Sequence, residues 1–396
     1  MTAAKAVRVS KSSLAPRLLF PLLTLALTGC SSVVGLTYIE DREHLAMVLR
    51  SRHLEADNPI LPFELNEEMR RFAHETAPAE LPAVEKLERL RNRLLDQSQM
   101  KVKYSWGYTG TAEEVFVNRE ANCLAFTNLF VGLAREVGVK VFFLSVNNVE
   151  NYRKEGDLVV VSDHVAVGYG DSSTSLSVYD FSDHEPIDAA DRRFVQRISD
   201  LTAIAMFYSN RGAEALRAGL VDAAVKWVHA AVLIDPLLAN GWVNYGVTLR
   251  RQGDLAQAEA SYRKAIELDP SLFSAYNNLA TLLRQQSRVE EAKAYEQELQ
   301  RGPNQNPYTY LSLGDISLRA GRLDEAGHFY RKAASLTKEN AEAWAALGQL
   351  AVVQGDLRSA RRLLKKAQEA AGVDVIARVS RLAEVIAATD RRPNSS

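Results

Sequence analysis

Cysteine is scarce in this chain of 396 residues, which contains only Cys30 and Cys123. Two cysteines that lie far apart in the sequence are too few for a disulfide framework. Their small number also excludes zinc sites built on pairs of cysteines. The seven histidines show no spacing typical of metal ligands, so the sequence predicts neither a metal nor another cofactor. An excess of charge is also missing, since the formal net charge is −1. Charge therefore gives no reason to expect nucleic acid as a partner.

The composition that remains is ordinary for a folded protein. Apolar residues make up 47% of the chain and charged residues 24%. A chain of this length is too long for one ordinary core, so two or three domains are expected.

Residues 1–30 have the order of regions that is typical of a targeting segment. Four basic side chains lie within residues 5–17, and an apolar run of about ten residues follows, which is too short to span a bilayer comfortably. The run ends in Leu27-Thr28-Gly29-Cys30, which resembles a bacterial lipoprotein signal. The resemblance implies that Cys30 is lipidated, and Ser31 after it favours the periplasmic face of the outer membrane. The alternative is an ordinary secretory signal with an incidental cysteine.

A helix is predicted from Cys123 to Val137. Asn122 is a residue type that favours the N-cap, and Gly138 stands where a glycine commonly ends a helix. Apolar residues recur at helical spacing at positions 123, 126, 130, 133 and 137. Cys123 then lies in the first turn, where unpaired backbone N–H groups and the helix dipole favour a thiolate. A structural cysteine would pack equally well on this apolar face, so the helix alone leaves both roles open.

Strands are predicted after this helix. Residues 139–146 form one strand candidate, residues 147–157 a polar loop, and residues 164–169 and 176–181 a hairpin. A turn centred on Ser172 would place His164 directly opposite Asp180, with Cβ atoms about 5 Å apart. An imidazole and a carboxylate would then be able to form a hydrogen bond. His184, in a loop before Pro186, is the alternative base.

The cysteine helix, Asp163-His164-Val165-Ala166-Val167 and Tyr179-Asp180 together resemble the transglutaminase-like superfamily, which has a papain-related fold, over about residues 58–200. The resemblance implies that Cys123 is the nucleophile, His164 its base and Asp180 the group that orients the base. The backbone N–H of Cys123 is expected to stabilise the oxyanion, with Trp106 as a candidate second donor. Water as acceptor would make the protein a peptidase or amidase, and an amine would make it a cross-linking enzyme. Both outcomes stay open.

From about residue 205 the sequence repeats every 34 residues, the period of tetratricopeptide repeats. Small residues recur at this spacing at Gly212, Gly246, Ala280, Gly314 and Gly348. Five units are predicted over residues 205–372, followed by a capping helix and a disordered tail within residues 373–396. The third unit is the least regular, because Glu296 and Leu299 stand where the second unit has Tyr262 and Ala265.

Basic residues recur near the ends of the first helices of these units. The candidate partner-binding residues are Arg217, Arg250, Arg251, Arg284 and Arg319, together with Asn244 and Asn278 one repeat apart. One interpretation is a basic stripe that holds an acidic segment or a C-terminal carboxylate of a protein partner. The other is that these cations complement helix C-termini on a solvated surface.

The sequence therefore predicts an α+β papain-like domain of the transglutaminase-like type over residues 31–200, followed by an all-α solenoid of tetratricopeptide repeats. The expected function is that of a lipid-anchored thiol enzyme of the bacterial cell envelope, acting on peptide or isopeptide amide bonds. The repeats would recruit a protein partner or substrate. The alternative is a non-catalytic adaptor lipoprotein of the envelope that uses the repeats to bind proteins.

Overall fold

The computed structural model describes residues 42–52, 59–96, 98–155, 158–170, 176–181, 195–301, 307–336, 340–371 and 377–390. The chain divides into two compact units, residues 1–35 and residues 36–396, and the fold below is that of the second. The predicted lipidation site Cys30 and the alternative base His184 lie outside the described residues. Among the helices that are described, none has the length and apolar character needed to cross a membrane.

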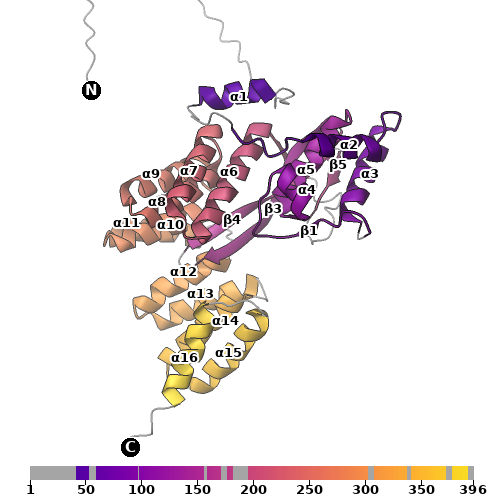
Figure 1. Ribbon diagram of the computed structural model, residues 1–396. Coiled ribbons are helices and arrows are strands. Elements are labelled where there is room, and N and C mark those ends of the chain that lie inside the picture. The colour runs from indigo at the N-terminus through magenta and orange to yellow at the C-terminus, as the bar shows by residue number, and fades with distance from the viewer. Residues whose placement is uncertain are drawn as a thin grey trace, which may run out of the picture. The chain divides into compact units, whose positions relative to one another are not determined.

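The first half of the described chain is an α+β domain, which we call the cysteine domain (Figure 1). Its helices are α1 (Arg42–Ser51), α2 (Glu67–Thr76), α3 (Ala83–Leu95), α4 (Ala112–Asn118) and α5 (Cys123–Glu136). The short strands β1 (Lys103–Tyr104) and β2 (Glu120–Ala121) pair in parallel. A four-stranded antiparallel sheet follows in the order β5-β4-β3-β6, made of β3 (Val141–Glu155), β4 (Leu158–Tyr169), β5 (Ser177–Tyr179) and β6 (Val195–Ile198).

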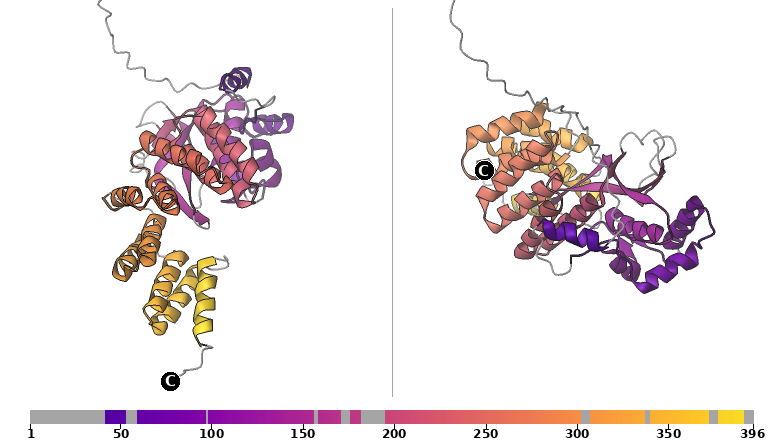
Figure 2. Two further views of the ribbon diagram at one scale, coloured as in Figure 1. Left: turned by 90° about the vertical axis from the view of Figure 1, so that its left-hand side faces the viewer. Right: turned by 90° about the horizontal axis from the view of Figure 1, so that it is seen from above.

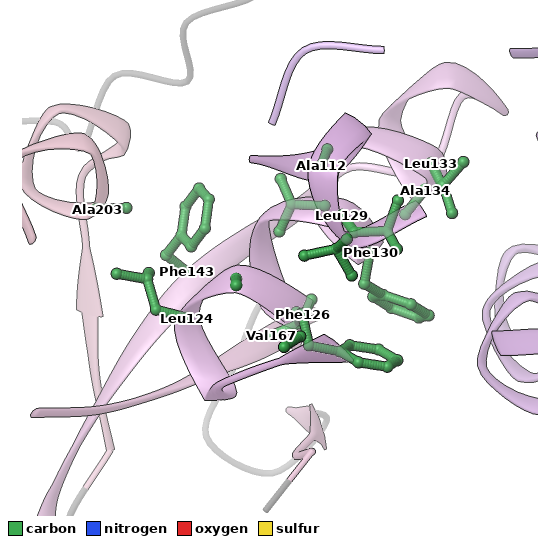
Figure 3. Close-up of a cluster of buried hydrophobic side chains, with 14 of the residues drawn as sticks. Ala112, Leu124, Phe126, Leu129, Phe130, Leu133, Ala134, Phe143, Val167 and Ala203 are labelled. Carbon is green, nitrogen blue, oxygen red and sulfur yellow. The ribbon is translucent and has the colours of Figure 1, made fainter. Parts of the chain in front are cut away.

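Helix α5 is the central element of this domain. It begins as predicted, because the Asn122 side chain accepts a hydrogen bond from the Ala125 N–H at 2.9 Å, and the left-handed Gly138 (φ 78°) follows its end. Every residue from Cys123 to Ala134 is buried, including the polar Thr127 and Asn128, so the helix is surrounded by the domain on all sides and not only on its predicted apolar face. Figure 3 shows its side chains among those of neighbouring elements, with Phe126 and Phe130 pointing away from Leu124.

The predicted strand pairing was wrong in two respects. The segment 147–155 was expected to be a loop, but its backbone continues β3, with an irregularity in the register between Val146 and Asn151. The β4–β5 ladder pairs Val167 with Tyr179, so Asp180 lies level with Ala166 instead of His164. The difference is two residues. Because side chains alternate between the faces of a sheet, a shift of two leaves Asp180 on the face of His164, as a diagonal neighbour.

The second half is a series of helix pairs with the predicted period. The pairs are α6 (Asp200–Arg217) with α7 (Val221–Ile234), α8 (Ala239–Gln252) with α9 (Leu255–Leu268), α10 (Phe273–Gln285) with α11 (Val289–Arg301), α12 (Pro307–Arg319) with α13 (Leu323–Leu336), and α14 (Ala341–Val353) with α15 (Leu357–Ala371). The last helix, α16 (Ala377–Asp390), packs against α14 and α15, in the place of the predicted cap. The further views in Figure 2 show the helices of each pair side by side.

Close approach of the two helices of a pair explains the recurring glycine. A Cβ atom on Gly246 would lie 2.5 Å from Cε1 of Tyr262, and Gly314 is covered in the same way by Tyr330. The third pair has Ala280 in place of the glycine and Glu296 in place of the tyrosine. The two positions thus change together in the irregular third unit. A tyrosine at position 296 would collide with the methyl group of Ala280.

The hydrophobic core of the cysteine domain extends beyond residue 200. One cluster of buried side chains joins α5 and the sheet to α6 and α7, reaching Ala231 and Ile234. Later helix pairs have smaller clusters of their own. The backbones of β3 and β4 also approach α8, α10 and α12, the first helices of the next three pairs. The first helix pair is therefore part of the core of the cysteine domain.

Candidate active site

The three residues expected to carry the chemistry come from different elements of the cysteine domain. Cys123 is the first residue of α5, His164 lies in β4, and Asp180 directly follows β5. The Nε2 atom of His164 lies 2.7 Å from Oδ1 of Asp180, and the same oxygen accepts a hydrogen bond from the Phe181 N–H. Cys123 is 4% exposed and His164 is 2% exposed. The imidazole and its carboxylate are thus brought together inside the domain.

The environment of His164 changes its protonation. Burial by itself lowers the pKa of the imidazole, because a charged ring loses hydration. The hydrogen bonds to Asp180 and Cys123, with the charges of these groups, outweigh burial and raise the pKa of His164 from 6.5 to about 10. The ring is therefore protonated at neutral pH. Since Nε2 faces the carboxylate, Nδ1 is left for the sulfur, where an imidazolium favours the thiolate.

Packing fixes the carboxylate end of this arrangement. The ring of Phe181, which follows Asp180, stacks on Phe126 with centroids 3.8 Å apart, and it also contacts Phe130 at 5.3 Å. Tyr179, on the other side of Asp180, packs against Phe130 at 5.6 Å. Because both neighbours of Asp180 are anchored on α5, the helix that carries the thiol also holds the residue that orients the imidazole.

A loop of residues 105–110 precedes α4 and packs against the start of α5. The Asn122 N–H donates to the carbonyl oxygen of Tyr108 at 3.1 Å, and the Asn122 amide donates to Oγ1 of Thr109 at 2.7 Å. Thr109 is fully buried and Asn122 is 6% exposed. The cap of α5 therefore has a second hydrogen-bond partner in this loop, which the sequence did not reveal.

Helix α6 of the first repeat pair holds the same loop from the other side. Oε1 of Glu214 accepts from the Thr109 N–H at 2.6 Å, and Arg211 donates to the Thr109 carbonyl oxygen at 3.4 Å. Arg217 donates to the carbonyl oxygen of Gly107 at 3.3 Å. Arg211, Glu214 and Arg217 are spaced at i, i+3 and i+6, and this spacing is the only feature of the sequence that indicates that they share one face of α6. It does not indicate what that face contacts.

Two predicted residues meet in this contact. The guanidinium of Arg217 lies 5.1 Å from the centre of the Trp106 ring. Arg217 was expected in a stripe that binds a partner, but it contacts the cysteine domain instead. Trp106 lies in the loop that adjoins the start of α5, and its role as an oxyanion donor stays a prediction.

The other predicted arginines lie near the ends of α8, α10 and α12. Arg250, Arg284 and Arg319 line a single pocket of about 430 Å³, whereas Arg251 is exposed and does not line it. Arg284 donates two hydrogen bonds to the carboxylate of Glu296, at 2.5 and 2.7 Å. The irregular third unit thus has an ion pair where the second and fourth units have a tyrosine.

The two predicted asparagines are buried between helices. Asn244 is 9% exposed and its amide donates to Oγ of Ser209 at 2.9 Å, and Asn278 is 1% exposed. Asn244 therefore connects two neighbouring units, and the side chain of Asn278 is buried within the array.

Comparisons with known proteins agree with this architecture. A model of the transglutaminase-like superfamily matches residues 70–168, which include Cys123 and His164 but end before Asp180. Models described as TPR repeat and tetratricopeptide repeat match residues 246–287 and 317–383. No curated protein matches the chain.

Several solved structures are similar to the repeat-containing part. The Cut9–Hcn1 hetero-tetramer of the APC/C is 19% identical with a TM-score of 0.41, and the match covers 48% of this chain and 37% of that one. PilF from Pseudomonas aeruginosa is 23% identical with a TM-score of 0.38, covering 47% of this chain and 86% of its own. A thermophilic TPR protein from Thermus thermophilus is 20% identical with a TM-score of 0.40, covering 46% of this chain and 97% of its own. The family models, together with the fold, identify this chain as one that contains a transglutaminase-like domain followed by tetratricopeptide repeats.

Proposed function

We propose that this protein is a thiol enzyme in which Cys123, His164 and Asp180 form a catalytic triad acting on peptide or isopeptide amide bonds. The observation that carries the proposal is the largely buried hydrogen bond of 2.7 Å between His164 and Asp180, with the raised pKa of the ring beside the Cys123 thiol. The position of Cys123 at the start of α5 adds support, because the helix dipole and backbone N–H groups there favour negative charge.

The proposed reaction uses these groups in two stages. The protonated ring of His164 already holds a proton on Nδ1, and the sulfur attacks the carbonyl carbon as a thiolate, forming a C–S bond while negative charge develops on the oxygen. The backbone N–H of Cys123 is the proposed donor that stabilises that charge. When the C–N bond breaks, His164 returns its proton to the leaving amine. Water or a second amine then attacks the thioester carbonyl and gives a proton to His164. The C–S bond breaks, the acid or the new amide leaves, and the Cys123 thiolate beside the protonated His164 is regenerated.

Covalent labelling of Cys123 tests this proposal. Iodoacetamide and a peptide with an electrophilic group in place of the scissile amide are applied near neutral pH, and modification is measured by mass spectrometry. We expect rapid labelling of the wild type, none in Cys123→Ala, and at least about tenfold slower labelling in His164→Ala, because the thiolate loses its partner. Labelling of His164→Ala at the wild-type rate, with circular dichroism confirming an unchanged fold, would falsify the triad.

We further propose that Cys30 is lipidated and anchors the protein at the periplasmic face of the outer membrane of a two-membrane bacterium. The support is the order of basic, apolar and small residues that ends in Leu27-Thr28-Gly29-Cys30. Metabolic labelling with a palmitate analogue tests the anchor. We expect incorporation that Cys30→Ala abolishes, and a processed, unlabelled wild type would instead indicate an ordinary secretory signal.

A second candidate function is that of a non-catalytic adaptor, which binds proteins through the repeats. Two observations favour it: only 4% of Cys123 is exposed, and arginines line a pocket in the repeat array. A thiol that stays unmodified in the native protein at neutral pH, combined with partner binding that Cys123→Ala leaves unchanged, would select this candidate.

A further inference from the structure

The pocket between α8, α10 and α12 has an uneven balance of charge. Its walls include Arg250, Arg284 and Arg319 with one acidic residue, Asp315, and the hydroxyl groups of Thr281 and Ser312. The three arginines come from equivalent ends of consecutive first helices, about one repeat apart in the sequence. The pocket therefore presents cationic groups from three successive units.

Internal ion pairs neutralise only part of this charge. Arg284 is bound by Glu296, and Asp315 is bound by Arg378 at 2.5 Å while it also accepts from the Tyr330 hydroxyl at 2.7 Å. Among the described residues, neither Arg250 nor Arg319 forms an ion pair with a carboxylate. The guanidinium groups of Arg250 and Arg319 are thus the uncompensated charges of the pocket.

Arg250 also has an unsatisfied hydrogen-bonding group. Its Nε donates to the Gln285 side chain at 3.2 Å, but its Nη1 is buried and has no acceptor in the described part of the chain. A buried cationic N–H that has lost its water and found no acceptor is costly, so the Arg250 guanidinium is incompletely satisfied within the repeat array. The planar guanidinium suits carboxylate oxygens in particular.

We propose that this pocket binds a carboxylate-rich segment of a protein partner, with Arg250 and Arg319 as its main contacts. The Glu296 carboxylate holds Arg284 and the Arg378 guanidinium holds Asp315, so Arg250 and Arg319 are left to receive the ligand. This site lies in the repeat array and does not depend on the chemistry of Cys123. Its ligand class is an acidic, extended peptide.

Fluorescence anisotropy with a labelled hexaglutamate peptide at low salt tests this site on the whole protein. We expect saturable binding that hexaglutamine does not reproduce and that added salt weakens. Arg250→Gln and Arg319→Gln should each raise Kd about tenfold. Arg251→Gln is the matched control, because it removes the same charge one residue away from a pocket-lining arginine, and it should change Kd by less than about twofold.

Three outcomes would overturn the proposal. They are an equal loss of affinity in Arg251→Gln, equal binding of hexaglutamine, and tighter binding of a phosphoserine peptide than of hexaglutamate. The first would indicate a diffuse charge effect, the second a contact with the peptide backbone, and the third a phosphate site. Circular dichroism of each variant separates loss of binding from loss of fold.

A different observation, the contact between α6 and the loop of residues 105–110, carries a second inference, which rests on the proposed thiol chemistry. A continuous series of hydrogen bonds runs from Glu214 to the Thr109 N–H, from Oγ1 of Thr109 to the Asn122 amide, and from Asn122 to the first turn of α5. The second and third of these bonds are buried. We infer that Glu214 and Thr109 are positioning residues for Cys123, so the first repeat helix is required for a reactive thiol.

The pH profile of Cys123 alkylation tests this inference. Thr109→Val removes the acceptor of the Asn122 amide and should slow alkylation about tenfold and shift its pH dependence, while Thr109→Ser restores the hydroxyl and the wild-type profile. Glu214→Ala should slow alkylation of Cys123 as much as Thr109→Val does. Glu214→Gln keeps an acceptor oxygen, so its alkylation rate and pH profile should be close to those of the wild type. Asp222→Ala is the control, because this acidic residue of the same helix pair accepts a hydrogen bond from Gln252 of the next pair.

The results also distinguish this inference from the triad itself. If wild-type labelling depends on His164 but Thr109→Val keeps the wild-type profile, the positioning role is wrong and the triad stands. If labelling never depends on His164, the triad fails. A thermal unfolding curve for Thr109→Val shows whether slow alkylation reflects a folded protein.

Discussion

The cysteine domain and the repeat array bury their side chains in different ways. In the former, the main cluster joins helices, sheet and the first repeat pair, a smaller one lies around Val146 and Ala166, and His164 is only 2% exposed. In the latter, each cluster belongs to one or two helix pairs, and the charged groups proposed for binding line a pocket. The comparison teaches that the geometry of the triad depends on a whole domain, whereas the arginine pocket depends on neighbouring units.

The largest expected effect comes from removing an aromatic side chain from each region. Phe130→Ala should lower the free energy of unfolding by about 3–5 kcal/mol and abolish Cys123 labelling, because Phe130 supports the residues on both sides of Asp180. Tyr330→Ala should loosen the fourth unit while labelling persists. Hydrogen exchange measured region by region checks both. If Tyr330→Ala lowered the protection of backbone amides from hydrogen exchange equally in all repeat units, the array would be as cooperative as the cysteine domain.

The irregular third unit offers an effect of intermediate size. Glu296→Tyr should cost about 1–3 kcal/mol, because the new ring meets the methyl group of Ala280 and Arg284 loses its carboxylate. Adding Ala280→Gly, which recreates the pair found at Gly246 and Tyr262, should recover part of this loss. Chemical denaturation of the single and double variants measures the coupling. Strictly additive effects would show that the two positions do not share a contact.

A smaller difference is expected between two equivalent helix caps. Asn340 caps α14 by accepting from the Ala343 N–H at 3.0 Å, and Asn340→Ala should cost about 1 kcal/mol. Asn122→Ala should cost about 2 kcal/mol, because it also leaves the buried Oγ1 of Thr109 without its donor. Thermal unfolding compares the two. Equal costs would mean that the hydrogen bond to Thr109 contributes nothing.

The final comparison concerns the dependence of stability on pH. The pKa of His164 is raised from 6.5 to about 10, so its stabilising contribution is fully present below pH 6.5 and is lost as the pH rises through 10. The Tm of the wild type should therefore fall over this interval by more than the Tm of His164→Gln. Parallel curves for the two proteins would contradict the raised pKa.

Local signals in the sequence predicted much of this structure. Asn122 and Gly138 gave the ends of α5 because capping depends on residues adjacent in the chain, and the period of 34 predicted the helix pairs because each unit repeats the same packing. The face shared by His164 and Asp180 was predicted, but their register was wrong by two residues. The face on which a side chain lies follows from alternation along the strand. The register between two strands depends instead on the turn that joins them, and the sequence did not determine the conformation of that turn.

Contacts between distant segments could not be predicted in the same way. The segment 147–155 has the polar composition of a loop, yet its backbone extends β3 towards the helices of the repeats. Arg217 occupies the same repeat position as Arg251 and Arg319, but it lies next to the cysteine domain and contacts Trp106. Identical sequence positions in a repeat thus have different partners, because only the first unit has the cysteine domain as its neighbour.

The single core that includes α6 and α7 has a consequence for how such a protein changes during evolution. A unit inserted or deleted within residues 239–371 would alter the length of the repeat array without removing any side chain from the buried cluster around α5. Loss of the first pair would expose the buried faces of Phe207 and Ile234 and of the elements they cover. Recombination is therefore expected to preserve the segment up to Ile234 as one inherited block, and to vary the number of units after it.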